Sequence, residues 1–335
     1  MRTTLGAALA LAMSLGATGA FAQDKEVTIV HQDMLVPFHS VVGTGKLEEA
    51  TGYKINWKRI PGGGDVIRAM ASGDAQIGEV GSSPATAAAS QGIDVQMFWV
   101  LDDIANAEQL VVRNDSGITS LADLKGKKVG VPFVSTAHYQ LLAALENAGV
   151  SPNDVEILNM APPAVAAAWE RGDIDATFIW DPVLSTAKAN GTVLISSGDI
   201  AKMGKPTFDV IMVDRTWASE NKDFMLELVK VLAEADEAYR SNAAAWTPDS
   251  PEVMAIAKTT GADAAMVPNA LSAYGFPTLE EQASSTWLGG GADSGVAKAL
   301  ADTAEFLKAQ GRITDVAPDY SKFVTDEYVK AAMSN

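Results

Sequence analysis

Hydrophobic positions along the chain follow two alternating patterns. Short runs rich in β-branched and aromatic residues are typical of strands, and each is followed by a stretch with helical character. The runs in the first part are VTIVH (27–31), YKINWKRI (53–60), QIGEV (76–80), VQMFWVL (95–101) and QLVVR (109–113). Helices are expected at about 40–50, after the Gly-rich loop at 62–64, and from Pro84. This order predicts a mostly parallel sheet flanked by helices.

The same rhythm restarts after LADLKGKKVGV (121–131). Further strands are expected at 128–133, 155–158, 176–180, 192–197 and 208–213, and the chain is mainly helical from Phe224 onward. The segments 69–84 and 167–182 also match: each has a helix, a Gly-Asp turn, a strand and a proline. We therefore predict an α/β protein of two similar lobes, with lobe 1 at 23–110 and 207–335 and lobe 2 at 111–206. Ligands of open α/β sheets bind beyond the carboxyl ends of strands, which places the ligand cleft between the lobes.

The first 22 residues differ from the rest. They contain Arg2, an uncharged run rich in Ala and Leu, and the sequence Ala20-Phe21-Ala22. This pattern predicts a secretory signal peptide that is cleaved near Ala22. A membrane anchor, the alternative, needs about 20 strongly apolar residues. Here the run is shorter and rich in Ala, Gly, Ser and Thr.

Composition narrows the classes of partner and chemistry. The formal charge of −17 becomes −18 once Arg2 is removed, with 24 basic against 42 acidic residues. Such a chain repels nucleic acid and anionic lipid, so neither is expected as a partner. The absence of cysteine excludes disulfides and thiol chemistry. Any anion site must therefore depend on local, directed donors.

Two loops carry hydroxyl groups at the start of predicted helices. Ser82 and Ser83 precede Pro84 in lobe 1, and Ser135 and Thr136 follow a strand in lobe 2. Each loop alone is typical of an ordinary helix cap. Together, in matching lobes, they predict an oxyanion site built from helix N-termini without Lys or Arg. The Gly-rich loop at 62–64 could provide a third such terminus.

Three further groups lie near this predicted site. His138 and Tyr139 fall in the first turn of the lobe 2 helix, where a histidine either packs, caps or contacts a ligand. Glu108 and Asp209 lie at the edges of apolar strands, where a charge is costly to bury without a partner. A bound cationic amine or a neighbouring Lys or Arg would supply that partner.

Metal and enzyme chemistry find little support. The histidines are His31, His39 and His138, and no two of them have helical ligand spacing with a carboxylate, so no metal or other cofactor is expected. The chain also lacks a G-x-S-x-G elbow, a P-loop and a dinucleotide-binding glycine motif.

Three blocks carry a family resemblance: MASGDAQIGEVGSSPATAAAS, VPFVSTAHYQLLAAL and PPAVAAAWERGDIDATFIWDP. They resemble the taurine- and alkanesulfonate-binding proteins of ABC importers, which are type II periplasmic binding proteins. The resemblance implies a periplasmic, monomeric receptor of two lobes that close about a hinge of two crossing strands. It implies that the receptor captures taurine and delivers it to a permease in the inner membrane.

The resemblance also implies roles for single residues. The sulfonate is expected at Ser82, Ser83, Ser135 and Thr136, beside His138 and Tyr139, and the ammonium near Glu108 and Asp209. Trp180 would line the cleft and cover the methylenes, unless it is a core residue. Gln32 and Phe38, in the loop after the first strand, and Asp181 are also expected to line it. Asp181 and most of that loop depart from the family pattern.

The departures leave other functions open. One alternative is a binder of another sulfonate, sulfate ester or phosphonate, such as an alkanesulfonate, hypotaurine or choline sulfate. The retained acids Glu108 and Asp209 argue against an uncharged tail. A second alternative is an enzyme on the same fold, like its pyrimidine-synthesising relatives. That class predicts reactive His or Cys at the cleft and a cytosolic chain, whereas this chain has a predicted signal peptide and no Cys.

Overall fold

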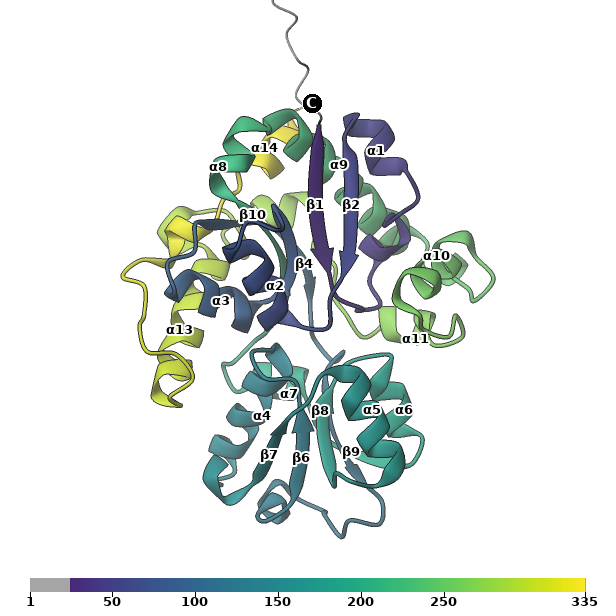
Figure 1. Ribbon diagram of the computed structural model, residues 1–335, viewed down its shortest axis with the longest axis vertical. Coiled ribbons are helices and arrows are strands. Elements are labelled where there is room, and N and C mark those ends of the chain that lie inside the picture. The colour runs from purple at the N-terminus through teal and green to yellow at the C-terminus, as the bar shows by residue number, and fades with distance from the viewer. Residues whose placement is uncertain (1–24, 335) are drawn as a thin grey trace, which may run out of the picture.

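The computed structural model describes residues 25–334, and the predicted signal peptide at 1–22 lies outside them. The described chain forms two α/β lobes, each built on a five-stranded sheet flanked by helices (Figure 1). The chain passes from lobe 1 to lobe 2 after β4 (Val95–Asp103) and returns before β10 (Phe208–Asp214). Within the described residues, no helix has the length and apolarity required to cross a membrane. The predicted two-lobed architecture is confirmed.

The sheets of the two lobes share one topology. In lobe 1 the strand order is β2-β1-β3-β10-β4, and in lobe 2 it is β7-β6-β8-β5-β9. In each sheet, the strand that follows a crossover between the lobes, β10 in lobe 1 and β5 in lobe 2, runs antiparallel to both of its neighbours. The remaining strands are β1 (Glu26–His31), β2 (Lys54–Arg59), β3 (Ile77–Gly81), β5 (Gln109–Arg113), β6 (Lys128–Val131), β7 (Glu156–Asn159), β8 (Ala176–Ile179) and β9 (Gly191–Ser196).

The helices cover both faces of the sheets. Lobe 2 contains α4 (Thr136–Asn147), α5 (Pro162–Arg171), α6 (Val183–Lys188) and α7 (Ser197–Lys202). Lobe 1 contains α1 (Lys46–Thr51), α2 (Gly63–Ala71), α3 (Ser82–Ser90), α8 (Arg215–Glu220), α9 (Lys222–Ser241), α10 (Pro251–Thr260), α11 (Val267–Leu271), α12 (Leu279–Ala283), α13 (Gly295–Ala309) and α14 (Glu327–Met333). The C-terminal helices join lobe 1, where α13 packs on α3 and α14 on α9.

Two predictions need correction. The helix expected at 40–50 is a 3-10 turn at Pro37–Ser40 followed by the short α1. Gly43 and Gly45, at φ angles of 68° and 83°, separate the two because an L-residue helix cannot continue through that backbone conformation. Gln109 and Leu110, expected in lobe 1, pair with β8 and β9 in the lobe 2 sheet.

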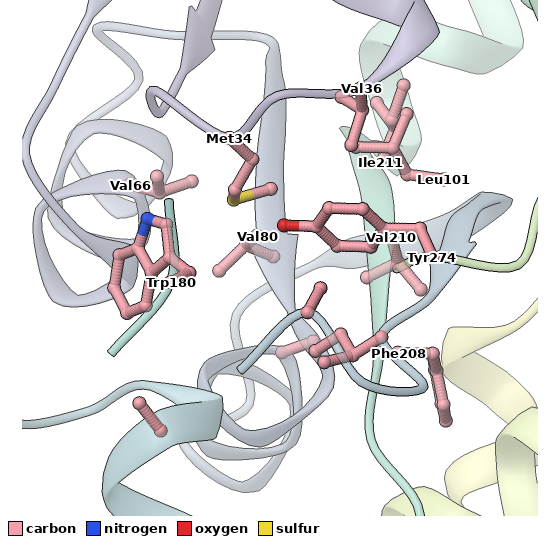
Figure 2. Close-up of a cluster of buried hydrophobic side chains, with 14 of the residues drawn as sticks. Met34, Val36, Val66, Val80, Leu101, Trp180, Phe208, Val210, Ile211 and Tyr274 are labelled. Carbon is pink, nitrogen blue, oxygen red and sulfur yellow. The ribbon is translucent and has the colours of Figure 1, made fainter. Parts of the chain in front are cut away.

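Buried side chains of the lobe 1 sheet form the floor beneath the space between the lobes (Figure 2). Val80, Val210 and Leu101 are fully buried on adjacent strands, and Met34 and Trp180 lie in front of them. Burying one large aliphatic side chain contributes about 1.5–3 kcal/mol relative to leaving it exposed. The strands near the cleft are therefore held rigidly in place, which fixes the side chains at their ends.

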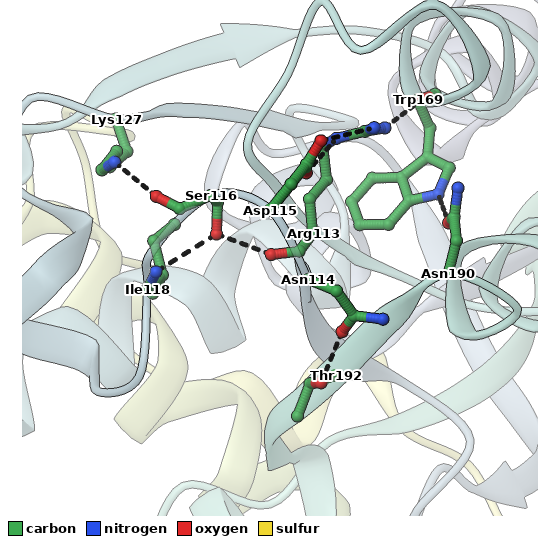
Figure 3. Close-up of polar contacts among 9 residues, drawn as sticks. All are labelled: Arg113, Asn114, Asp115, Ser116, Ile118, Lys127, Trp169, Asn190 and Thr192. Carbon is green, nitrogen blue, oxygen red and sulfur yellow. Dashed lines mark hydrogen bonds and ion pairs between the residues drawn. The ribbon is translucent and has the colours of Figure 1, made fainter.

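Lobe 2 is secured by a polar network around Arg113, which ends β5 (Figure 3). Its Nη1 donates to the Trp169 carbonyl at 2.7 Å, and its guanidinium lies 5.5 Å from the centroid of the Trp169 ring. The indole N–H of Trp169 donates in turn to Asn190 Oδ1 at 2.7 Å. These bonds tie α5 to the sheet and leave the opposite end of the strands to face lobe 1.

Candidate functional site

A small cavity of about 240 Å³ lies between the lobes. Lobe 1 lines it with Gln32, Met34, Gly63, Gly81, Pro84 and Asp209, and Glu108, Ser135, Thr136 and Trp180 complete it from the crossover and lobe 2. Because residues of both lobes line it, a small molecule bound in this cavity would contact both lobes.

Three helices begin at the cavity wall. Gly63 is the first residue of α2, Pro84 lies in the first turn of α3, and Thr136 is the first residue of α4. The first N–H groups of a helix have no partner within the helix, and its dipole makes that end positive. The convergence of α2, α3 and α4 therefore gives this wall a positive electrostatic character without a Lys or Arg.

The predicted hydroxyl groups differ in what they contact. Ser135 Oγ accepts from the His138 backbone N–H at 3.0 Å and donates to the Pro132 carbonyl at 2.6 Å, so it caps α4. Ser82 Oγ accepts from the Phe208 backbone N–H at 3.4 Å. Both side chains are thus engaged within the protein. Anion recognition here would rest on backbone N–H groups more than on hydroxyls.

Glycine allows the lobes to approach each other closely. A Cβ at Gly81 would lie 2.6 Å from Thr136 Cγ2, and a Cβ at Gly63 would lie 2.6 Å from Pro84 Cγ and 3.0 Å from the Val134 carbonyl oxygen. Val134, at the tip of the lobe 2 loop, has a φ angle of 55° although it is not glycine. Side chains at Gly81 or Gly63 would collide with these neighbours in the arrangement observed.

Glu108 and Asp209 bring two carboxyl groups to the same cavity, and both side chains are buried. Thr136 Oγ1 donates to Glu108 Oε1 at 2.6 Å, while Glu108 Oε2 is buried without a partner. Burial and the nearby charge of Asp209 raise the pKa of Glu108 to about 8, and the Thr136 hydrogen bond opposes this rise. A cation placed between the two groups would favour their ionised forms.

Two more carboxyl groups lie behind Asp209. Asp102 pairs with Asp209 across β4 and β10, and Glu79 lies on β3, which borders β10 on the other side. Burial and then the charge of Glu79 raise the pKa of Asp209 to about 8. Burial and then the charge of Asp209 raise the pKa of Asp102 well above its usual range. Among the described residues, no Lys or Arg forms an ion pair with Glu108, Asp102 or Asp209. The neighbouring Lys or Arg that could have paired with Glu108 and Asp209 is therefore not found in this part of the chain.

One of these carboxyl groups, that of Glu79, has a histidine as its partner. His39 Nε2 lies 3.0 Å from Glu79 Oε2, and both side chains are fully buried. Burial alone would lower the pKa of His39, but the charge and hydrogen bond of Glu79 raise it overall. The charges of Glu108, Asp102 and Asp209 must instead be neutralised by protons or by a bound cation.

The wall between the two polar ends is apolar. Figure 2 shows the Trp180 ring and the Met34 thioether on the same side of the cavity floor, with the Tyr274 hydroxyl directed toward Met34. Burial and then the neighbouring carboxyl groups, Asp102 first, raise the pKa of Tyr274 well above its usual range. Sequence reasoning did not select Met34 or Tyr274, because no motif marks them and only the fold brings them here.

Six of the predicted site residues line the small cavity: Gln32, Glu108, Ser135, Thr136, Trp180 and Asp209. The others lie nearby in different settings. Ser83 and His138 line a second cavity of about 740 Å³ together with Arg312. There the His138 ring stacks on Phe133 at 4.3 Å, and burial and then Arg312 lower its pKa to about 4.

The remaining predicted residues make contacts inside the protein. The Tyr139 ring packs against Phe306, with their centroids 5.0 Å apart. Phe38 is buried against Trp57, with centroids 6.0 Å apart, and Asp181 Oδ1 accepts from the Ser185 backbone N–H in α6 at 2.8 Å. These three side chains, like Ser82, stabilise the lobes and do not line the small cavity, so we leave them out of the proposed ligand contacts.

One cluster was missed because its members are distant in sequence. His31, His39 and Glu79 each offer a ligand atom, and these atoms lie within 4.8 Å of one another. The histidine spacing had argued against metal binding. Spacing along one helix could not detect this group, since it is drawn from β1, the turn after it and β3.

Comparisons with known proteins agree with this architecture. The family model described as NMT1/THI5 like matches residues 22–243. The chain is 36% identical over 330 residues to the taurine-binding periplasmic protein of Escherichia coli K12, covering 98% of each chain. A crystal structure of the periplasmic aliphatic sulphonate binding protein from Escherichia coli has a TM-score of 0.71 and 24% identity, covering 90% of this chain and 92% of that one. The alkanesulfonate-binding protein from Xanthomonas axonopodis pv. citri, bound to MOPS, also has a TM-score of 0.71, with 23% identity and coverage of 91% and 97%. The chain therefore belongs to the NMT1/THI5-like family, within its branch of periplasmic taurine- and sulfonate-binding proteins.

Proposed function

We propose that this protein is a periplasmic receptor that captures taurine, or a close aminosulfonate, and delivers it to the permease of an ABC importer. The observation that carries the proposal is one small cavity with opposite chemistry at its two ends. Three helix N-termini line it, and so do the carboxyl groups of Glu108 and Asp209. A short zwitterion matches this pattern of charge.

The anionic end of the ligand would rest on the first turns of α2, α3 and α4. Backbone N–H groups at a helix start bind tetrahedral oxyanions through directed hydrogen bonds and the helix dipole. Such a site suits this acidic chain, because the net charge of −17 disfavours small anions at long range while local donors favour them at contact. Thr136 and Gly63 bring donors from opposite lobes, so a bound sulfonate would hold the lobes together.

The ammonium end would lie between Glu108 and Asp209. Both groups are buried without a Lys or Arg partner in the described part of the chain, and their pKa values are raised to about 8. A bound ammonium would supply the missing counter-charge and donate charge-assisted hydrogen bonds to the two carboxylates. The methylenes between the two ends would pack against Trp180 and Met34, and the Trp180 face also attracts a cation.

Delivery would follow closure of the lobes about the two crossovers between β4 and β5 and between β9 and β10. Hinge closure around a ligand is the usual transition of two-lobed binding proteins. The curated taurine-binding relative is periplasmic, and it supports the same location for this chain after removal of the predicted signal peptide near Ala22. We further propose a non-catalytic receptor that works as a monomer with a permease in the inner membrane.

Other sulfonates, phosphonates or sulfate esters remain the alternative class of ligand, since relatives in the same fold bind aliphatic sulfonates. Alkanesulfonates would leave Glu108 and Asp209 unpaired in a buried site, which is costly. Hypotaurine keeps the amine and would fit the carboxyl end. Choline sulfate carries a bulkier head group, which the close walls at Gly63, Gly81 and Pro84 disfavour.

Titration calorimetry of the mature chain (23–335) with taurine, ethanesulfonate and β-alanine tests the proposal. We expect taurine to bind at least about 100-fold more tightly than either control, because a site that pairs buried polar groups strongly rejects an analogue lacking one partner. Ethanesulfonate binding as tight as that of taurine would remove the amine role of Glu108 and Asp209. Absence of heat with all three would reject this ligand class.

A further inference from the structure

Three buried side chains from separate segments meet behind the ligand cavity. His31 ends β1, His39 lies in the 3-10 turn, and Glu79 is in the middle of β3. His39 and Glu79 are fully buried, and His31 is 3% exposed. One ring nitrogen of each histidine and one oxygen of Glu79 all lie within 4.8 Å of one another. We propose that this His31–His39–Glu79 cluster binds a transition-metal ion of the Zn²⁺ type.

The histidine rings are oriented as metal ligands usually are. His31 Nδ1 lies 2.8 Å from the Gln32 carbonyl oxygen, and His39 Nδ1 is hydrogen-bonded to the Met34 carbonyl. When Nδ1–H donates to a backbone carbonyl, a neutral imidazole carries its lone pair on Nε2. Metal-binding histidines are held in this way by their second nitrogen. Both Nε2 atoms are therefore available to a cation.

Glu79 provides the second, independent observation. Its Oε2 faces His39 Nε2 at 3.0 Å, and its Oε1 is fully buried without a hydrogen-bond partner. A lone pair and a carboxylate oxygen at this distance require a positive charge between them, which is either a proton or a metal ion. A proton on His39 pairs with Oε2 of Glu79 and leaves Oε1 without a partner. A metal ion, with its larger charge, would neutralise the Glu79 carboxylate more fully.

The geometry and charge suit zinc. Bonds of about 2.1 Å in a tetrahedral site separate ligand atoms by about 3.4 Å, so the cluster needs a contraction of at most about 1.4 Å. Two histidines and one carboxylate with a fourth position open to water form a known zinc ligand set. Asp102 and Asp209 interact with Glu79 and favour a cation at the cluster when they are ionised, whereas the positive charge of Arg59 near His31 disfavours one.

The cluster is connected to the wall of the ligand cavity. Gln32 and Met34, whose carbonyls hold the two rings, also line that cavity with their side chains. A bound ion would therefore fix the loop after β1 in its ligand-binding conformation. Zinc binding itself does not depend on which ligand the cavity takes.

The test uses the untagged mature chain after treatment with a chelator. We expect calorimetric titration with Zn²⁺ to give one equivalent bound, and Co²⁺ to give the visible absorption of a tetrahedral site. His31→Gln and Glu79→Gln should each weaken Zn²⁺ binding by more than about 100-fold. Even the loss of a residue that only hydrogen-bonds to a metal ligand lowers metal affinity by about 10–100-fold. His138→Gln is the matched control, since it removes a buried histidine in lobe 2 and should leave Zn²⁺ binding unchanged.

Two results would overturn the proposal. One is the absence of saturable one-equivalent binding by the wild-type chain, which would leave His39 and Glu79 as a buried ion pair only. The other is equal binding by the wild type and both ligand variants, which would assign the ion to surface carboxylates. Thermal unfolding with chelator present shows which variants are folded, and His31→Gln decides the question if Glu79→Gln does not fold.

Discussion

The Thr136 hydroxyl donates a 2.6 Å hydrogen bond to Glu108 Oε1, and this bond joins the two chemical ends of the cavity. Thr136 begins α4, one of the helices at the proposed anion end, and Glu108 is one of the two acids at the proposed amine end. The bond lowers the pKa of Glu108, against the larger effects of burial and of Asp209. Thr136 therefore helps to keep Glu108 ionised for a cationic ligand.

Thr136→Val removes this bond with little change of shape. We expect taurine affinity at pH 7 to fall about 10- to 100-fold, because a hydrogen bond to a charged group contributes about 1.5–3 kcal/mol. Calorimetry measures the change. Thr177→Val is the matched control: Thr177 is fully buried on β8 and its hydroxyl has no partner, so this variant should bind taurine like the wild type. Equal affinities in both variants would contradict the role of Thr136.

Taurine binding should be linked to proton release. Burial and neighbouring carboxyl groups raise the pKa values of Glu108 and Asp209 to about 8, so the ligand-free site holds a proton at neutral pH that an incoming ammonium displaces. We expect taurine affinity to rise between pH 6 and about 8, and the apparent binding enthalpy at pH 7 to change with the ionisation enthalpy of the buffer. Glu108→Gln should bind more weakly and show a shallower pH dependence. A binding enthalpy that is independent of the buffer would contradict this.

The same carboxyl groups should make the ligand-free protein less stable at higher pH. The folded pKa of Glu108, about 8, lies above its ordinary 4.5, so the folded state holds more protons than the unfolded chain between these values. Stability then falls as pH rises through that window. His39, with a raised pKa, acts in the same direction.

His31 and His138, with pKa values lowered to about 4, act in the opposite direction as pH falls below 6.5. The comparison is therefore made above pH 6.5. We expect the Tm of the ligand-free wild type to decrease from pH 6.5 to 8.5 and the decrease to be smaller in Glu108→Gln. A Tm that rises over this range would show that the acids are ionised and paired in the folded state.

Gly81→Ala should impair closure without unfolding lobe 1. The new Cβ would lie 2.6 Å from Thr136 Cγ2, on the other side of the cavity, and 3.1 Å from Oδ1 of Asp209, the partner of Gly81 on the neighbouring strand β10. We expect weaker taurine binding and, with taurine present, a larger radius of gyration by small-angle X-ray scattering. Gly275→Ala is the control, because its nearest neighbour, Asp103 Cβ, would be at an ordinary 3.4 Å. Wild-type affinity in Gly81→Ala would show that lobe 2 approaches less closely than the structure indicates.

The order of strands and helices was set by the sequence itself. Periods of two and 3.6 in hydrophobicity are local, so strands such as QLVVR (109–113) and FDVIMV (208–213) could be located without a structure. The helix starts at Pro84 and Ser135 were equally readable, because caps are local in sequence. The need of Glu108 and Asp209 for a cationic partner followed from their position on apolar strands.

Tertiary structure decided which of these groups meet. Ser83 precedes the cavity residue Pro84, and Tyr139 lies three residues after Thr136. The Ser83 side chain nevertheless lines the second cavity, and the Tyr139 ring packs on Phe306. Asp102 and Glu79 lie beside Asp209 only because β4 and β3 flank β10 in one sheet, and the chain reaches β10 after passing through the whole of lobe 2. His39 is brought to Glu79 by the turn after β1. Burial raises the pKa values of these acids by removing water, and burial is a property of the folded chain alone.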